Sequence, residues 1–139
     1  MVPEKNLSAD GYRLLGEAEW EFAARGGIKS RGYTYAGGDD MAKLGWYRDN
    51  SEGADCNLQD GRGTWPVAQK KANELGLYDM SGMVFEWCWD SWSETHPYRM
   101  IRGGCFLFYA ESASVSARIR SDPETRDQYR GFRLARSVR

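Results

Sequence analysis

The chain has 139 residues and a net charge of −1, because 19 Lys and Arg stand against 20 Asp and Glu, and it contains 6 Trp, 8 Tyr and 5 Phe. This length suits a single domain, and the high aromatic content excludes a disordered chain. No apolar run approaches the roughly 20 residues of a membrane-spanning helix, so an integral membrane protein of that kind is excluded.

The cysteines and the charge distribution give two further limits. Cys56, Cys88 and Cys105 are an odd number without a CxxC motif, so neither a disulfide framework nor a thiolate metal site is predicted. Residues 98–139 hold nine Arg and four acidic residues, which leaves an anionic partner to consider. Residues 1–5 lack the charged start and apolar stretch of a secretory signal, so we expect no signal peptide in this chain.

The first periodic segment predicts an amphipathic helix over residues 14–25. Leu15, Ala18 and Phe22 recur at helical spacing, and Gly26 and the glycine after it end the pattern. Residues 30–73 follow as a turn-rich stretch in which Gly, Asp and Asn interrupt every short apolar run. We therefore expect long irregular structure there.

Three short strands are predicted in the second half of the chain. Phe85, Trp87 and Trp89 alternate with smaller or polar residues over 84–90, which is the period of a strand. Further strands are expected at 98–102 and 132–136. Residues 105–130 show no clean period after Tyr109, and no internal repeat occurs in the chain.

Four short motifs occur in order along residues 11–137, and together they resemble the formylglycine-generating enzyme, or sulfatase-modifying factor, superfamily. They are Gly11-Tyr12-Arg13-Leu14 with Glu17-Ala18-Glu19-Trp20-Glu21-Phe22-Ala23-Ala24-Arg25-Gly26-Gly27; Asn73-Glu74-Leu75-Gly76-Leu77-Tyr78-Asp79-Met80-Ser81-Gly82; Glu86-Trp87-Cys88-Trp89-Asp90; and Arg102-Gly103-Gly104 with Gly131-Phe132-Arg133.

The resemblance implies an α+β domain with the C-type lectin fold of the formylglycine-generating-enzyme subclass, loop-rich and with few short strands and helices. Family members have a further strand and helix before the position that matches Gly11. We therefore expect residues 1–139 to form one domain of this type that lacks the family's N-terminal portion.

The motif residues have structural roles that compete with catalytic ones. Large aromatics dominate burial in small domains, so we assign Trp20, Phe22, Trp87 and Trp89 to the core. Glu17, Glu19 and Glu86 are candidate catalytic carboxylates, but helix-surface charges or partners of a buried Arg102 or Arg133 are the favoured interpretation. Gly103, Gly104 and Gly131 mark sharp turns or close backbone approach.

The enzymatic branch of the family uses two copper-binding cysteines a few residues after its Arg-Gly-Gly motif. When Arg102-Gly103-Gly104 is set on that motif, the two cysteine positions fall at Phe108 and Ala113, which neither ligate a metal nor carry redox chemistry. Cys105 comes too early and reads as a small buried residue. We therefore expect no enzymatic activity of this type.

The sequence does not favour histidine-based or calcium-dependent chemistry. His96 is the only histidine, which excludes the histidine cluster of the related iron-dependent sulfoxide synthases, and no nucleophile-elbow sequence supports a Ser-His-Asp triad. Family members bind calcium near their Gly-Asn-Val-Trp-Glu-Trp stretch, but Met83 places a thioether where an oxygen ligand is needed. No cofactor is expected, and calcium near Asn50 or Asp60 is kept as an open alternative.

The segment before Gly131 departs from the Asn-rich loop usual in the family and looks like the variable proteins of diversity-generating retroelements. In those systems, mutagenesis of Asn codons yields Phe, Leu, Tyr, Ser, Ile, Asp, Thr, Arg or Ala, and most residues at the positions in question belong to that set. Glu124 and Gln128 do not, so some positions are background. A mixture of rigid aromatics and small polar residues is typical of paratopes. The candidate ligand-binding residues are Leu107, Phe108, Tyr109, Ser112, Ser114, Ser116, Ile119, Arg120, Ser121, Asp122, Thr125, Asp127, Gln128 and Tyr129.

These observations favour a non-enzymatic ligand-binding protein whose hypervariable surface lies at about residues 105–129. The expected partner is a protein or cell-surface ligand, and the resemblance suggests a cell or virion surface. Scattered acids argue against nucleic acid, and we expect Arg118, Arg126 and Arg133 to pair with Glu111, Asp122, Glu124 or Asp127. Alternatives are an enzyme or enzyme-like domain that oxidises a substrate cysteine, and a structural lectin-fold module. Residues 107–109 could also form an ordinary edge or core strand.

Overall fold

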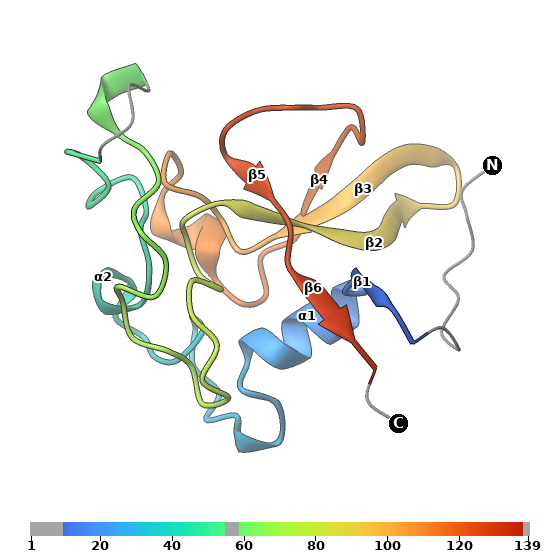
Figure 1. Ribbon diagram of the computed structural model, residues 1–139, viewed down its shortest axis with the longest axis horizontal. Helices are drawn as coiled ribbons and strands as arrows, with labels where there is room; N and C mark the ends of the chain where they lie inside the picture. Colours follow the sequence, from blue (N-terminus) through green and yellow to red (C-terminus); the bar gives the residue numbers. More distant parts are fainter. Residues whose placement is uncertain (1–9, 55–58, 138–139) are drawn as a thin grey trace.

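The computed structural model describes residues 10–54 and 59–137, and it consists of two small sheets, one main helix and long loops (Figure 1). The predicted α+β class with few short elements is confirmed. Cys56 and the N-terminal residues 1–9 lie outside the described residues. In the part of the chain that is described, no helix is long and apolar enough to cross a membrane.

A curled four-stranded sheet forms the centre of the molecule, in the order β4-β3-β2-β5. β2 (Phe85–Ser93) and β3 (His96–Arg102) form an antiparallel hairpin, which confirms the strands predicted at 84–90 and 98–102. β4 (Ile119–Ser121) adds antiparallel to β3, and β5 (Arg130–Gly131) adds parallel to β2. The segment between residues 103 and 129 therefore begins in the middle of the sheet and ends at its edge.

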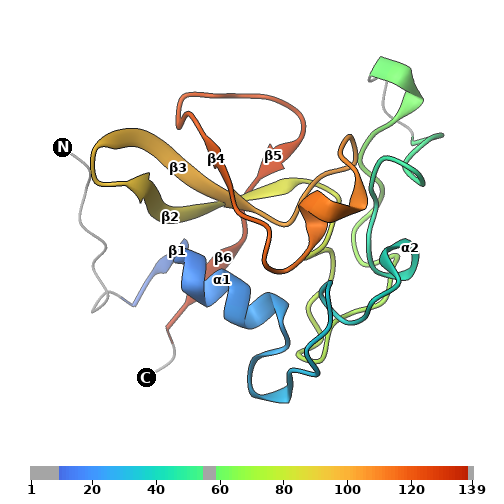
Figure 2. The ribbon, with the colours of Figure 1, turned by 180° about the vertical axis from the view of Figure 1, so that it is seen from behind.

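A second, two-stranded sheet joins the two ends of the described chain. β1 (Tyr12–Leu14) pairs antiparallel with β6 (Leu134–Arg136), with Arg13 opposite Ala135. Figures 1 and 2 show both strands beside the helix and next to the central sheet. The predicted strand at 132–136 is thus confirmed in its second half, whereas β1 had too few residues to show a period.

Helix α1 (Glu17–Ala24) covers one face of the central sheet. Its first turn is closed by the Glu19 carboxylate, which accepts a hydrogen bond of 2.7 Å from Gly16 N, and its end is followed by Gly26 at φ 92°. Trp20 and Ala24 are fully buried and pack with the sheet residues in one apolar cluster. The predicted helix is confirmed, beginning three residues later than expected.

Trp20 and Phe22, two of the four aromatics assigned to the core, lie on different sides of helix α1. Trp20 is buried, but Phe22 is 57% exposed, so its assignment to the core was wrong. Residues two positions apart on a helix do not share a face, and Phe22 therefore points away from the sheet when Trp20 points toward it. Trp87 is partly buried on the opposite face of the sheet, and Trp89 is partly buried as well.

The region of residues 30–73 is irregular, as its turn-rich composition predicted. The short helical turn η1 (Gly27–Lys29) precedes it, and its described residues include the short helices α2 (Met41–Leu44) and η2 (Gln59–Gly61). Buried side chains of α2 and backbone bonds such as Met83 N to Trp46 O at 2.7 Å attach this region to the start of β2. The loops are therefore packed against the sheet and not loose appendages.

A buried arginine links the helix to the sheet. Arg102, whose side chain is 0% exposed, donates to Glu17 and Glu21 at 2.6 Å and to the carbonyl of Val115 at 2.6 Å. Burial alone would raise the pKa of Glu17, but the hydrogen bonds and charges of Arg118 and Arg102 outweigh it and hold the pKa below its ordinary value. The prediction that Glu17 serves a buried arginine is confirmed.

Other acidic residues of the motifs also have structural partners. Glu86 accepts from Trp20 Nε1 at 2.7 Å and from Arg133 at 2.8 Å, as predicted for a carboxylate that serves a buried or partly buried arginine. The acidic partners predicted for Arg118 and Arg133 within residues 111–127 were wrong, because Arg118 pairs with Glu17 and Arg133 with Glu86. Both acids lie far away in sequence, so local proximity was a poor guide.

Candidate binding surface

Parts of the segment of residues 105–129 pack on the face of the central sheet opposite α1, whereas Val115 packs in the apolar cluster on the α1 side. On the face opposite α1, Cys105 packs in a second apolar cluster with Phe85 of β2 and Ile101 of β3. Ser121 ends β4 at one edge of the sheet, and Tyr129 directly precedes β5 at the other edge. Figures 1 and 2 show the orange stretch before β4 beside one end of the sheet, and the red loop between β4 and β5 projecting from it.

The turn that starts this segment depends on Gly104. Its φ is +72°, and a Cβ atom there would lie 2.8 Å from the Ala113 backbone. Only glycine adopts this conformation without strain at so close an approach. The predicted role of the Gly103-Gly104 pair as a sharp turn is therefore confirmed, and Ala113 is buried directly against it.

Some candidate residues of the segment face inward. Leu107, Ile119 and Tyr129 are partly buried against the second apolar cluster, and Ser121 is buried. These side chains hold the segment to the sheet and offer only part of their surface to a partner.

Two other candidates, Phe108 and Tyr109, are exposed and form, together with the partly buried Tyr129, what we define as the aromatic patch. Phe108 is 45% exposed and stands edge-on to the buried Phe85, with 5.3 Å between ring centroids. Its ring lies 6.5 Å from that of Tyr129, and Tyr109 is 60% exposed. An edge or core strand at 107–109 was the competing expectation; the structure has no strand there.

Backbone hydrogen bonds fix the position of the aromatic patch. Arg48 N donates to Phe108 O at 3.0 Å, and the buried Ser51 hydroxyl donates to Phe106 O at 2.7 Å. Phe106 N donates to Met83 O at 3.0 Å, and the Phe106 side chain is fully buried. The exposed rings are thus carried by backbone that is held from both sides.

Charged groups border the aromatic patch. The Arg48 guanidinium lies 5.2 Å from the centre of the Tyr109 ring, and that of Arg130 lies 4.9 Å from the centre of the Tyr129 ring. Arg130 also pairs with Asp127. The surface therefore combines rigid aromatic area with groups that donate and accept hydrogen bonds, a mixture suited to protein recognition.

The serine candidates follow the aromatic patch around η3 (Ala110–Ala113). Ser112 donates to the carbonyl of Tyr109 at 2.9 Å, which supports the backbone of the patch. Ser114 is partly buried and Ser116 is exposed.

The remaining candidates lie on β4 and the loop after it. Arg120 is exposed and lies over the rings of Trp92 and Tyr98, at 5.5 and 5.1 Å from their centres. Asp122 accepts from Thr125 N at 3.0 Å, which makes a turn. Gln128 is exposed on the loop that returns to the aromatic patch. The candidates are therefore divided between two edges of one sheet.

Sequence reasoning missed Arg48 as a member of this surface. It lies about sixty positions before Phe108 in a stretch without a period, and only the fold brings its guanidinium to Tyr109. The motif Asn50-Ser51 gave an indirect signal, because the Ser51 side chain is what ties this loop to Phe106.

The two described thiols are closed off from solvent. Cys88 and Cys105 are each 1% exposed, on opposite faces of the sheet. Burial raises the pKa of Cys88 to about 12 and that of Cys105 to about 11. Reactive thiols are accessible and have lowered pKa values, so both cysteines have the properties of structural residues.

The candidate metal and triad residues have local roles in the structure. Both ends of the Asn50 amide bind backbone, since Oδ1 accepts from Tyr47 N and Nδ2 donates to Gly45 O. Within residues 10–54 and 59–137, no three His, Cys, Asp or Glu side chains gather in a group that could hold a metal ion. His96 sits at the exposed β2–β3 turn, where it contacts the hydroxyls of Ser93 and Thr95.

Comparison with known proteins gives consistent results. Residues 4–138 match the family described as "Sulfatase-modifying factor enzyme 1-like domain". A chaperone protein LppX of Paenibacillus barcinonensis is 40% identical over 95% of this chain and 51% of its own length, and a formylglycine-generating enzyme of Streptomyces coelicolor is 34% identical over 90% and 46%.

Among solved structures, Treponema denticola variable protein 1 superposes with a TM-score of 0.80 at 33% identity, over 94% of this chain and 49% of that one. The likeness confirms the predicted C-type lectin fold of the formylglycine-generating-enzyme subclass, and with it the resemblance to a retroelement variable protein. The chain spans about half the length of the relatives it matches. By sequence and by fold, this chain belongs to the sulfatase-modifying factor enzyme 1-like, or formylglycine-generating-enzyme-like, family.

Proposed function

We propose that this domain is a non-enzymatic ligand-binding protein whose contact surface is the outward side of residues 105–129. The ligand would be a protein or another cell-surface molecule, met at a cell or virion surface. The observation that carries the proposal is the aromatic patch. The rings of Phe108 and Tyr109 are 45% and 60% exposed, and hydrogen bonds hold their backbone in place.

Physical reasons support this use of the surface. Aromatic side chains with few rotatable bonds supply contact area at low entropic cost, and a fixed backbone removes the cost of ordering the loop on binding. The likeness to a protein named as variable supports the idea that outward residues of this segment differ between copies of the gene. The buried thiols, and Phe108 and Ala113 at the positions of the family's catalytic cysteines, support a role without chemistry.

The test is to sequence this gene from many cells of one source population and to count substitutions at each position. We expect substitutions to concentrate at exposed positions, such as Phe108, Tyr109 and Arg120. The segment carries its own controls, because Phe106 and Val115 are buried in the same stretch and should stay constant. Substitutions spread equally over exposed and buried positions, or absent from the segment, would refute the diversified surface.

An oxidase of substrate cysteines is the second candidate, because the family match and a formylglycine-generating enzyme among the relatives favour it. Incubation of the protein with a cysteine-containing sulfatase peptide, copper and air should leave the peptide unchanged under our proposal. Formation of an aldehyde on that peptide would show the enzymatic alternative to be correct.

A further inference from the structure

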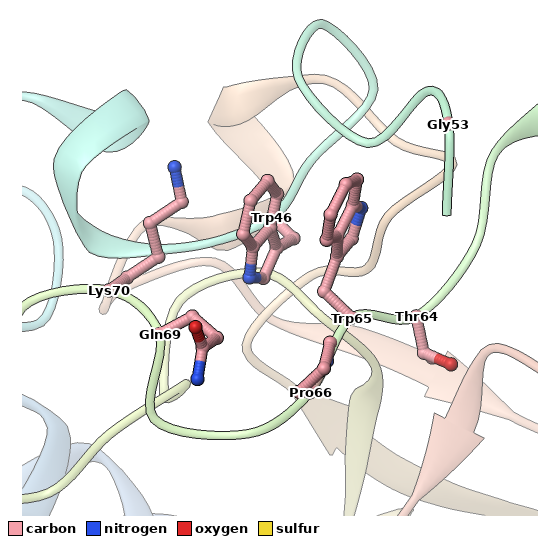
Figure 3. Close-up of a pocket in the computed structure, with 7 residues that line it drawn as sticks. All are labelled: Trp46, Gly53, Thr64, Trp65, Pro66, Gln69 and Lys70. Atoms are coloured by element: carbon pink, nitrogen blue, oxygen red, sulfur yellow. The ribbon is translucent and has the colours of Figure 1, made fainter. Parts of the chain in front are cut away.

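A separate cleft of about 480 Å³ lies between the loop that follows α2 and the loop of residues 64–70 (Figure 3). Its side chains come from both loops, and none of the candidate residues of the 105–129 surface lines it. Its lining side chains include Trp46, Thr64, Trp65, Pro66, Gln69 and Lys70.

Two stacked indoles form the wall of this cleft. The rings of Trp46 and Trp65 are 4.4 Å apart at their centres and 10° from parallel, and Lys70 Nζ lies 4.0 Å from the centre of the Trp46 ring. Figure 3 shows the three side chains in a row, with Lys70 and Trp65 on either side of Trp46. A stacked, cation-capped pair is a rigid apolar surface that exists before any ligand arrives.

The surrounding backbone fixes this pair. Trp65 Nε1 donates to Ser51 O at 3.4 Å, and Trp46 O accepts from Met83 N at 2.7 Å. Gly82 permits that contact, because a Cβ atom at its φ of +84° would lie 2.4 Å from Trp46 O. The indoles are therefore held by the same residues that start the central sheet.

Lys70 is the donor of the cleft with hydrogens to spare. Trp46 Nε1 is buried and has no hydrogen-bond acceptor among residues 10–54 and 59–137, so it is an N–H reporter inside the wall and not a contact for a ligand. Lys70 donates to Ala42 O at 2.8 Å and has further ammonium hydrogens.

The charge of the cleft has one sign. Lys70 is its charged side chain, and none of the lining side chains in the described part of the chain is acidic. A ligand suited to these groups has a flat apolar face for the indole wall and a negative charge near Lys70.

We propose that this cleft binds a small carboxylate that carries a flat ring, with the carboxylate beside Lys70 Nζ and the ring against Trp65 and Pro66. The ring can be aromatic or a saccharide, because both have a flat apolar face. The site is independent of the function proposed for residues 105–129.

The experiment is a titration of the ¹⁵N-labelled protein followed by the indole N–H signals in NMR spectra. The probes are phenylacetate and glucuronate, and phenylacetamide and glucose are their uncharged counterparts. Trp46→Phe assigns the Trp46 signal by deleting it. We expect that signal to shift and saturate with at least one carboxylate, at dissociation constants around the millimolar range. Phenylacetate alone would identify an aromatic ligand, glucuronate alone a saccharide, and both together the shared chemistry.

Two variants test the indole wall and the lysine separately. Trp65→Leu should weaken carboxylate binding about tenfold by removing the ring surface. Lys70→Met should weaken the carboxylates by a similar factor of about ten and leave the uncharged probes unchanged. Lys29→Met, an exposed lysine outside the cleft, is the charge-matched control and should bind as the original protein does.

Three results would overturn the proposal, provided that the remaining signals show a folded protein. One is a Trp46 signal that neither carboxylate moves to saturation. Another is an equal response to the uncharged probes. The third is a loss in Lys29→Met that matches the loss in Lys70→Met, since that would be a general charge effect.

Discussion

The two faces of the central sheet are held by different kinds of interaction. On the α1 side, the buried Arg102 binds two carboxylates and a carbonyl, and Glu86 accepts hydrogen bonds from Trp20 and Arg133. On the outer side, apolar contacts hold Cys105, Leu107, Ile119 and Tyr129, and hydrogen bonds from neighbouring loops hold the backbone of Phe106 and Phe108. Val115 and Arg118 of the same segment bind on the α1 side.

This difference indicates which side chains must stay constant and which can be replaced. Ion pairs between side chains require specific residues at both ends, so the α1 side tolerates few substitutions. Backbone hydrogen bonds do not depend on the identity of the side chain, so Phe108 and Tyr109 can be replaced while their carbonyls keep their partners. The outer side therefore has a backbone that is compatible with the diversified surface proposed above.

The sharpest contrast is within the outer segment itself. Phe106 is 0% exposed, so Phe106→Ala should lower the free energy of unfolding by about 3–5 kcal/mol, the cost of a large cavity. Phe108→Ala removes the same atoms from a half-exposed site and should cost less than about 1 kcal/mol. Urea unfolding of both variants measures the difference. Equal costs would mean that Phe108 belongs to the core.

On the α1 side, the corresponding test is Arg102→Met. We expect a loss of about 3 kcal/mol, at the lower end for a broken buried ion pair, because Arg118 and Arg25 still reach the two carboxylates. The matched control is Arg118→Met, since Arg118 shares Glu17 but its side chain is 54% exposed. That control should cost less than about 1 kcal/mol. Similar losses in the two variants would contradict a special role for the buried arginine.

The sequence predicted the α1 side better than the outer side, and the reason is physical. The helix and the central hairpin have regular periods, and their motif residues meet one another, so Glu17, Arg102 and Glu86 could be assigned as ion-pair residues. The helical period did not reveal that Phe22 faces solvent, because a helix has two sides and the period does not say which one meets the sheet.

The sequence located the outer segment but did not predict its conformation or its contacts. Its lack of a period marked it as exceptional, yet the pairing of Arg48 with Tyr109 and the burial of Ser121 depend on contacts made across the fold. The stacked Trp46 and Trp65 are likewise separated by a loop whose path no local pattern fixes.

Acid should weaken the α1 side first. The pKa values of Glu17 and Glu21 lie below the ordinary 4.5, because their arginine partners outweigh the effect of burial. A lowered pKa in the folded state stabilises the protein at pH values above 4.5, and that contribution is lost as the pH falls through the folded-state values. Unfolding free energies measured from pH 7 to pH 3 should therefore decline in this window.

Two variants connect that decline to the buried arginine. Glu21→Gln should be less stable at pH 7 by about 1 kcal/mol and should show a shallower decline below pH 4.5. Glu94→Gln, at an exposed position of the β2–β3 turn, is the charge-matched control. An identical pH profile for Glu21→Gln and the original protein would show that Glu21 does not carry the effect.

The reactivity of the two buried thiols measures local opening on each face of the sheet separately, without a substitution in either face. In a Cys56→Ser background, Cys88 lies on the α1 side and Cys105 under the outer segment. With pKa values of about 12 and about 11, both should be unreactive toward a disulfide reagent at pH 8 in the folded protein. In urea concentrations below the unfolding transition, Cys105 should react before Cys88, because a segment held by backbone bonds and apolar contacts opens locally at lower cost than a helix fixed by buried ion pairs. Mass spectrometry of the labelled cysteine identifies the order. If Cys88 reacts first, or both react only with global unfolding, the outer segment is as firmly held as the α1 side, and the freedom to exchange its outward residues must come from their exposure alone.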